Sequence, residues 1–346
     1  MTIYISIFLL LFGSVFSQKN NKKLFIISLL VLYAIAALQS ATVGADANMY
    51  YNSFKNIQNN HPPAYHEQGL KWLSQLVILL NGGFYTFQAI FYILILAPVG
   101  YVIYKKSKNY QLSLLLFVAF FYYTNSFCIL RQSLALSFAI VVFYFIDDKK
   151  YILAIIAYIL AFFSHKSGAI AIIAFILPFV KSTKKLDLII LAFTFVIGFL
   201  IPIVKCAPLL GPYSHYITNM ANAPQWGIRP NHLLYAGVIF ALNGVFTLFM
   251  IKDTDKNTQS LWCKLVIIGL IIMNLTQQLI LGFRISQFFM VAQIIYYPQN
   301  IELKKTYKKQ WLYGLLLFAT IYFIGLLIRD SSGIIPYDIC FQLKTH

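Results

Sequence analysis

Long apolar runs recur from one end of this sequence to the other, and they constrain the fold more than any other feature. Most contain about 15 to 20 residues, which as a helix is enough to cross the roughly 30 Å hydrocarbon core of a bilayer. Only 11% of the residues are charged, against about 25% in a typical soluble domain. Because a bilayer core leaves helices as the only open-chain structure that can span it, we predict an all-α, polytopic integral membrane protein.

The spacing of the runs predicts about 12 transmembrane helices in one membrane-embedded domain, residues 1–346. The expected spans are 1–17, 24–43, 84–104, 109–124, 128–146, 151–164, 167–180, 186–204, 232–251, 261–281, 286–299 and 311–328. Residues 67–83 are amphipathic and end in Gly-Gly, which indicates an interfacial or re-entrant helix that does not cross. It belongs to the first of two long outer loops, 44–83 and 205–231.

The lysines alternate with the spans. Most of them lie in short loops such as 105–108 and 147–150, on what the positive-inside rule makes the cytoplasmic side. Both termini then face outward. The net charge of +17 is therefore explained by topology and by contact with membrane lipids, and we expect no nucleic-acid partner.

All arginines and all histidines are on the opposite, outer side. They are Arg131, Arg229, Arg284, Arg329, His61, His66, His165, His215, His232 and His346. Lysine alone would serve topology, whereas arginine offers a planar fork that binds phosphate bidentately and stays charged. Histidine titrates near neutral pH. The segregation predicts chemistry at the outer face.

Residues 125–168 form the central feature of this side. Two apolar helices are predicted, joined by the charged turn 147–150, with Arg131 and Gln132 about one turn inside the first and His165 closing the second. A hairpin would bring both polar ends to one membrane face. An arginine at membrane depth indicates function, and the alternative is snorkelling to the headgroups. For His165 the alternative is hydrogen bonding to the last helix carbonyls.

Two outer acids and one further arginine complete the candidates. Asp46 follows the end of a predicted span and precedes Tyr50 and Tyr51, and Glu67 begins the amphipathic segment 67–83, so each is a candidate catalytic acid or base or a simple helix cap. Arg284 marks the turn between two spans, and Arg131 and Arg284 together are predicted to clamp a diphosphate. The sequence contains no nucleotide-binding loop and no zinc-protease motif. We expect no cofactor and no metal.

The order of six motifs resembles the EpsG family of membrane exopolysaccharide and O-antigen polymerases of the Wzy type. The motifs are GADANMYYNSF (44–54), EQGLKWL (67–73), NSFCILRQSLALSF (125–138), FFSHKSG (162–168), GFRISQFF (282–289) and IIPY (334–337). The resemblance covers about residues 40 to 340. It implies a metal-independent glycosyltransferase on the outer face of the bacterial cytoplasmic (inner) membrane. The enzyme would polymerise oligosaccharide repeat units carried on undecaprenyl diphosphate into exopolysaccharide, capsule or O-antigen, with a chain-length regulator and a flippase as partners.

That reaction assigns roles to the candidates. Arg131 and Arg284 would stabilise the negative charge that develops on the diphosphate. The acceptor hydroxyl must lose a proton, and Glu67 or His165 is favoured as the base, with Asp46 as an orienting group. Further substrate contacts are predicted for Tyr50, Tyr51, Gln132, Asn125, Lys166 and Gln287.

Three other functions fit parts of the pattern. A flippase or transporter of lipid-linked sugar needs polar residues along the whole passage, whereas here the ionisable residues cluster at the outer ends. A membrane acyltransferase would use a cytoplasmic donor, far from the predicted position of His165. A glycan ligase shares the same chemistry, and only the resemblance favours the polymerase.

Overall fold

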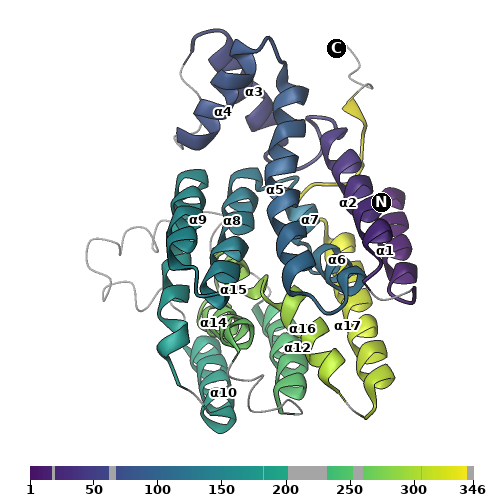
Figure 1. The fold of residues 1–346 in the computed structure, drawn as a ribbon, viewed down its shortest axis with the longest axis vertical. Coiled ribbons are helices and arrows are strands. Elements are labelled where there is room, and N and C mark those ends of the chain that lie inside the picture. Colours follow the sequence, from purple (N-terminus) through teal and green to yellow (C-terminus); the bar gives the residue numbers. More distant parts are fainter. Residues whose placement is uncertain are drawn as a thin grey trace. The chain divides into compact units, whose positions relative to one another are not determined.

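A computed structural model describes residues 1–17, 20–61, 68–181, 183–201, 232–251, 260–304 and 306–340. Over these residues the secondary structure is helical, apart from one isolated antiparallel bridge between Gln39 and Ile339. The all-α prediction is therefore confirmed for the described part of the chain (Figure 1).

The helices differ widely in length. They are α1 (Thr2–Ser14), α2 (Lys22–Ala37), α3 (Ala47–Gln58), α4 (Gln68–Leu79), α5 (Phe84–Lys106), α6 (Tyr110–Ala119), α7 (Tyr122–Asn125), α8 (Leu130–Asp147), α9 (Tyr151–Ser164), the 3-10 helices η1 (Lys166–Phe175) and η2 (Leu177–Phe179), α10 (Lys184–Leu200), α12 (His232–Ile251), α14 (Leu261–Leu275), α15 (Ile280–Met290), α16 (Gln293–Leu303) and α17 (Lys308–Arg329).

Four of the described helices are long and apolar enough to cross a membrane: α5, α8, α12 and α17. Several others, among them α1, α6, α9 and α14, are apolar but shorter. The apolar helical architecture expected of a membrane protein is thus present, while the count of twelve crossings stays a prediction.

Several elements differ from the sequence-based expectation. The expected span 109–124 is broken at Phe121, whose left-handed backbone (φ 65°) ends one helix before the next begins. The expected span 286–299 is split between α15 and α16. Residues expected to span at 167–180 form 3-10 turns, a tighter winding that is seldom sustained. The predicted outer loop contains a helix, α3, whose buried face includes Tyr50 and Phe54.

The chain divides into two compact units, and each is considered by itself below. Unit 1 contains residues 1–169 and 301–346, and unit 2 contains residues 170–300. Whether the two units make one domain, as predicted for residues 1–346, stays a prediction.

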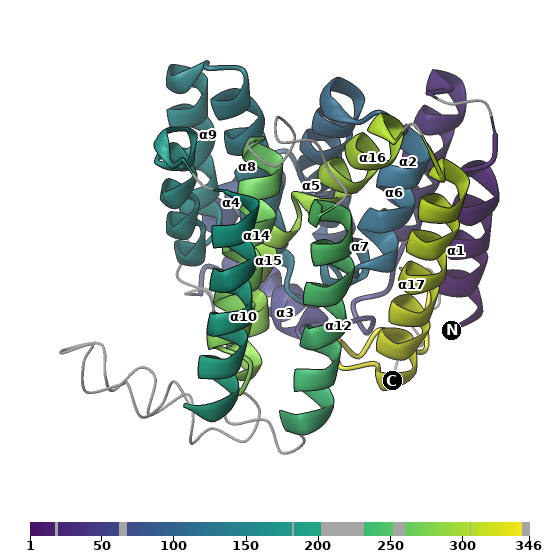
Figure 2. The same cartoon turned by 90° about the horizontal axis from the view of Figure 1, so that it is seen from below.

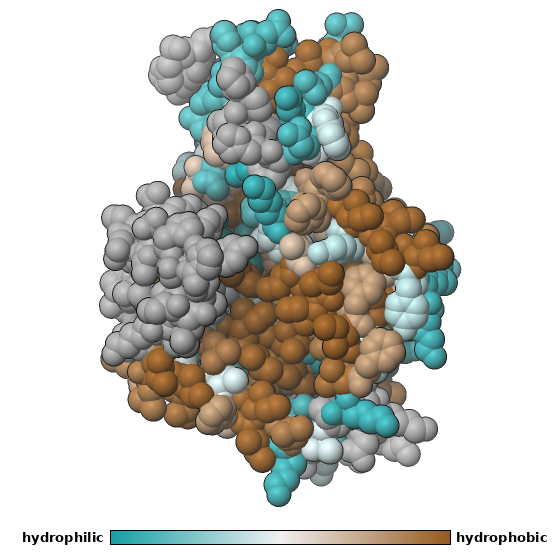
Figure 3. Space-filling view, turned by 90° about the vertical axis from the view of Figure 1, so that its left-hand side faces the viewer, coloured by the Kyte–Doolittle hydropathy of each residue, from teal (hydrophilic) through white to brown (hydrophobic). Residues whose placement is uncertain are grey.

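The helices α8 and α9 of unit 1 pack side by side as the predicted hairpin (Figures 1 and 2). One stripe of α9 is apolar and exposed, at Ile152, Ile155, Ile156, Ile159, Phe162 and Phe163. The side of the molecule that carries α9 shows a broad hydrophobic surface (Figure 3). Such a surface suits contact with lipid chains rather than with water.

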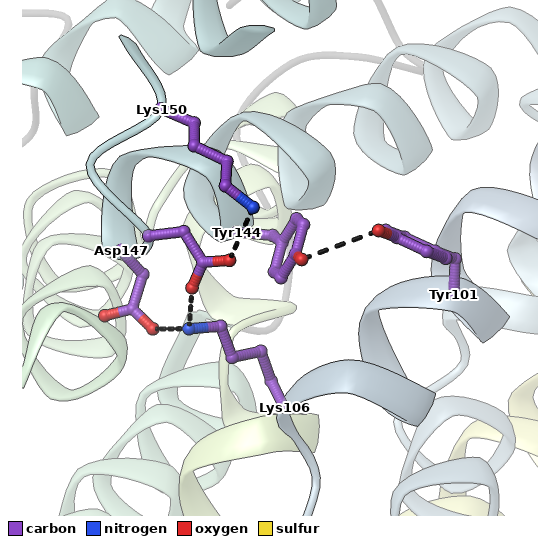
Figure 4. A network of polar contacts seen from close by, with 6 residues as sticks. Tyr101, Lys106, Tyr144, Asp147 and Lys150 are labelled. Atoms are coloured by element: carbon purple, nitrogen blue, oxygen red, sulfur yellow. Dashed lines mark hydrogen bonds and ion pairs between the residues drawn. The ribbon is translucent and has the colours of Figure 1, made fainter.

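Three lysine-containing loops meet at one end of unit 1. Lys106, the last residue of α5, forms ion pairs with Asp147 and with Asp148, the latter at 2.6 Å (Figure 4). Lys22, at the start of α2, lies 5.3 Å from the ring centroid of Tyr104. Predicted cytoplasmic loops that are far apart in the sequence therefore gather at a common end of this unit.

The same cluster has an electrostatic consequence. Hydrogen bonding from Lys106 holds the pKa of the Asp148 carboxyl below its usual value. Lys150 adds a second cation 3.6 Å from Asp148, and the Tyr101 and Tyr144 hydroxyls lie 3.5 Å apart (Figure 4). These contacts tie the lysine-rich end of α5 to the turn of the α8–α9 hairpin.

Buried asparagine side chains join three helices of unit 2. The Asn274 side chain donates to Leu191 O and to Thr194 Oγ1, both at 3.1 Å, and accepts from Asn243 Nδ2 at 2.7 Å. Helices α10, α12 and α14 are thereby linked through one side chain. Gly198 lets α10 come close, because a Cβ there would lie 1.9 Å from the Asn274 carbonyl oxygen.

Candidate active site in unit 1

The α8–α9 hairpin brings Arg131 and His165 to the same end of unit 1. Arg131 is the second residue of α8, and His165 is the residue on which α9 ends. The sequence placed Arg131 about one turn inside its helix. The structure places it in the first turn, because Ile129 has a non-helical backbone (φ −101°, ψ 57°) and α8 therefore begins at Leu130.

Arg131 is held by a tyrosine of α3. Its Nε donates to the Tyr50 hydroxyl at 3.4 Å, and its guanidinium carbon lies 5.8 Å from the Tyr50 ring centroid. The Tyr50 side chain is buried, and this burial raises the pKa of its hydroxyl, so Tyr50 stays neutral. The contact fixes the orientation of the cation by a hydrogen bond and a cation–π interaction together.

Asp46 is the N-cap residue of α3, one turn before Tyr50. Its side chain makes no capping hydrogen bond to the helix backbone. Asp46 therefore does not act as a side-chain N-cap of α3, the alternative that its position in the sequence allowed. The half-buried carboxylate lies close enough to Tyr50 to interact with it electrostatically.

A C-terminal segment, residues 330–340, closes this end of the unit, and we name it the clasp. Its backbone pairs with the chain that leads into α3: Gly44 N donates to Gly333 O at 2.8 Å, and Ala45 N donates to Ser332 O at 2.9 Å. Two tyrosines reinforce it, since Tyr4 donates to Ile334 O and Tyr337 donates to Ile35 O. The clasp thus holds the backbone that presents Asp46.

The clasp also orients Asn125. The Ser332 hydroxyl donates to Asn125 Oδ1 at 2.9 Å. The oxygen of the Asn125 side-chain amide is therefore the acceptor in this contact, and its nitrogen Nδ2 is a donor. The backbone of Gly44 packs directly against Phe127, because a Cβ at residue 44 would lie 2.2 Å from Phe127 O. Gly44 has φ +105°, a conformation that L side chains rarely adopt.

His165 is fixed from its own chain. Its Nδ1 lies 2.6 Å from Ser167 Oγ and accepts from the Ser167 backbone N at 3.1 Å. Gly168 turns back onto α9, because a Cβ there would lie 2.5 Å from Ala161 O. Lys166, next to His165, is exposed.

The first turn of α4 lies against the end of α9. A Cβ on Gly69 would lie 3.0 Å from Phe163 O, and the ring centroids of Trp72 and Phe163 are 6.1 Å apart. Helix α4 has twelve residues and is about 18 Å long; that it does not cross the membrane stays a prediction. Glu67 itself lies outside the described residues.

The remaining candidates fall into two groups. Gln132 is buried in α8, and Tyr51 is half-buried with its ring 5.1 Å from that of Phe84. Arg284, which is half-buried, and Gln287, which is buried, belong to α15 of unit 2. The clamp formed by Arg131 and Arg284 stays a prediction, because the two residues belong to different units.

The position of helix α15, which carries Arg284, depends on the turn that precedes it in unit 2. Gly282, in the first turn of α15, packs against Thr276, because a Cβ at residue 282 would lie 2.0 Å from Thr276 Oγ1. Gln277 and Gln278 then donate to Phe195 O and to Gly198 O of α10. The chain between α14 and α15, which precedes Arg284, is therefore anchored to α10.

The family model of the EpsG family matches residues 22–339. The chain belongs to the EpsG family. No curated protein and no solved structure matches it. The matched range runs from the start of α2 into the clasp, so it contains every candidate residue of the site.

The sequence of this EpsG-family chain did not single out Ser332 or Ser167, which the structure places in contact with Asn125 and with His165. Ser332 lies in the sequence Asp-Ser-Ser-Gly, which is typical of a turn. That signal predicts local structure and gives no indication of a contact with Asn125. Ser167 lies two residues after His165, a spacing at which serine commonly bonds a neighbouring group.

Proposed function

We propose that this EpsG-family protein is a polysaccharide polymerase, a glycosyltransferase that extends a glycan on the outer face of the bacterial cytoplasmic membrane. Its substrates would be oligosaccharide repeat units on undecaprenyl diphosphate. The observation that carries the proposal is the contact between Arg131 and buried Tyr50. The carboxylate of Asp46, which makes no capping hydrogen bond to α3, lies one turn before Tyr50. A fixed cation and an available carboxylate are the two groups that such a transfer needs.

The chemistry balances without an added co-reactant. The bond between the sugar's anomeric carbon and the diphosphate oxygen breaks, and its electron pair stays on the diphosphate. A bond then forms from the acceptor hydroxyl oxygen to the same carbon. The fixed guanidinium of Arg131 stabilises the charge on the leaving group, a type of stabilisation worth about 10²–10³-fold in rate for a single donor. The proton of the acceptor hydroxyl passes to Asp46, Glu67 or His165.

The membrane setting supports the same assignment. The lysine-rich loops gather at one end of unit 1, around Lys106, and the candidate site lies at the other end of the α8–α9 hairpin. With the lysines cytoplasmic, the site faces outward, where lipid-linked repeat units are joined. A flippase that supplies the repeat units and a chain-length regulator are the partners that we propose for it.

Deletion of the gene, followed by analysis of lipid-linked glycans, tests this function. A polymerase predicts that single repeat units accumulate on the outer face. Full-length polymer still attached to its lipid would instead indicate a ligase. Loss of outward-facing units would indicate a flippase. Either of the last two results would overturn the proposal.

Complementation then tests the site. Arg131→Ala should fail to restore polymer, while the matched control Arg329→Ala should restore it. Arg329 ends α17 and has no predicted role in the reaction. Equal restoration by both variants would argue against a catalytic role for Arg131.

A further inference from the structure

The hydrogen bonds of His165 determine which ring nitrogen carries its proton. The Ser167 backbone N–H is always a donor, and it points to Nδ1 at 3.1 Å. Nδ1 must therefore be the unprotonated, accepting nitrogen of the neutral imidazole. The Ser167 hydroxyl, 2.6 Å from the same nitrogen, then donates to it as well.

The proton of the neutral ring consequently lies on Nε2. In this tautomer Nε2 is a donor, and it has no lone pair with which to take a proton from an acceptor hydroxyl. A proton added to Nδ1 would face the Ser167 N–H donor. The geometry therefore makes His165 a hydrogen-bond donor rather than a base, a role in which a histidine is set by the bond that its other nitrogen makes.

The surroundings of His165 suit an anion. Lys166 follows it and is exposed. Arg131 lies at the same end of the hairpin. Cations and a ring N–H donor at one end of a hairpin are groups that a phosphate can bind.

We propose that His165 donates from Nε2 to a phosphate oxygen of the lipid diphosphate, and that Ser167 is the positioning residue that holds the donor tautomer. The inference rests on the proposed polymerase function and refines it. As the anomeric carbon–oxygen bond breaks, its electron pair moves to the diphosphate, and the Nε2–H bond strengthens with that charge. No proton leaves His165, and the proton of the acceptor hydroxyl goes to a carboxylate, Asp46 or Glu67.

Nitrogen NMR on the purified full-length protein, labelled with ¹⁵N-histidine, tests the tautomer without any substrate. The His165 signals are assigned by their loss in His165→Gln. The proposal expects Nδ1 to show an acceptor-type resonance and Nε2 a protonated one. Ser167→Ala removes the hydroxyl and keeps the backbone N–H, so it should shift the Nδ1 resonance while Nδ1 remains the acceptor. Ser164→Ala should leave the Nδ1 resonance unchanged, because the Ser164 hydroxyl bonds to Leu160 O in its own helix. A protonated Nδ1 in the neutral ring would overturn the proposal.

A substitution series on polymer formation from lipid-linked units tests the donor role. Glutamine places an amide N–H near the position of Nε2, whereas asparagine places one near Nδ1. His165→Gln should keep at least about a tenth of the rate, while His165→Asn and His165→Ala should lose about 10²–10³-fold, as for removal of one donor to a developing anion. Equal loss in all three variants would overturn the donor role.

The pH profile separates donor from base. Nε2 carries a proton in both the neutral and the charged ring, so a donor role predicts that any loss of rate at acid pH is also present in His165→Gln. A base would lose activity on protonation, and the acid limb would disappear in the variant. If the wild-type protein forms no polymer, the proposed function fails, while the NMR result still decides the tautomer.

Discussion

Gly44→Ala gives a direct test of the clasp. At φ +105° an alanine is strained, which costs roughly 1–3 kcal/mol. Its Cβ would lie 2.2 Å from Phe127 O, whereas ordinary carbon–oxygen contacts are about 3.3 Å or longer. The backbone at residue 44 must therefore shift by about 1 Å, the difference between the two distances.

That shift acts on the two hydrogen bonds that join the clasp to the chain before α3. These run from Gly44 N to Gly333 O at 2.8 Å and from Ala45 N to Ser332 O at 2.9 Å, and each contributes about 1 kcal/mol net. Together with the backbone strain, the free energy of unfolding of this region should fall by roughly 3–5 kcal/mol.

Thermal unfolding in detergent micelles measures the global effect, and thiol labelling measures the local one. Cys340 lies at the end of the clasp, is buried, and donates its backbone N–H to Leu38 O. In Gly44→Ala a maleimide should label Cys340 faster, as read by mass spectrometry. Gly13→Ala is the matched control, because nothing lies within 4 Å of a Cβ at that position in α1. If both variants unfold at the same temperature and label Cys340 at the same rate, the reasoning is refuted.

Three other predictions concern separate parts of the chain. Arg131→Lys keeps the charge and loses the fork, so polymer yield should fall at least about tenfold while the protein remains folded, as measured by complementation and thermal unfolding. Asp148→Asn should cost about 1 kcal/mol at pH 7 by removing the charged bond from Lys106, as measured by denaturant unfolding. Asn274→Ala should destabilise unit 2 by roughly 1–3 kcal/mol, because it removes bonds to two neighbouring helices, with the unfolding temperature as the readout.

The Asp148 prediction also has a definite pH dependence. Because the folded pKa of Asp148 is lowered, its contribution is present above the unfolded value of about 3.9 and is lost as the pH falls through the folded pKa. Wild-type and Asp148→Asn proteins should therefore converge in stability under strongly acid conditions. A constant difference down to that pH would contradict the ion pair with Lys106 as the cause.

Controls for the other two are equally direct. Arg131→Ala should be no more active than Arg131→Lys, and full activity of the lysine variant would show that charge alone suffices. Asn243 bonds to one other helix, through Asn274, and to Ile239 O in its own helix, whereas Asn274 bonds to both α10 and α12. Asn243→Ala should therefore cost less than Asn274→Ala, and the reverse order would contradict the assigned bonds.

Features that depend on local composition could be predicted from the order of the residues. The length of an apolar run decides whether a helix can cross lipid, and a short charged turn between two such runs predicts a hairpin. The helical class and the α8–α9 hairpin were therefore predicted from the residues alone. The hairpin also placed Arg131 and His165 at one end, because a tight turn such as 147–150 leaves two helices of similar length no other arrangement.

The contacts that give those residues a defined chemistry came only from the tertiary structure. Tyr50 against Arg131 and Ser332 against Asn125 join residues that are 81 and 207 positions apart. Neither pair has a periodic or spacing signal, because each depends on how helices and the clasp pack. The structure likewise decided that Asp46 leaves its helix uncapped and that Ser167 faces Nδ1 of His165. Hydrogen-bond direction is a property of atoms brought together in space, and residue order alone does not contain it.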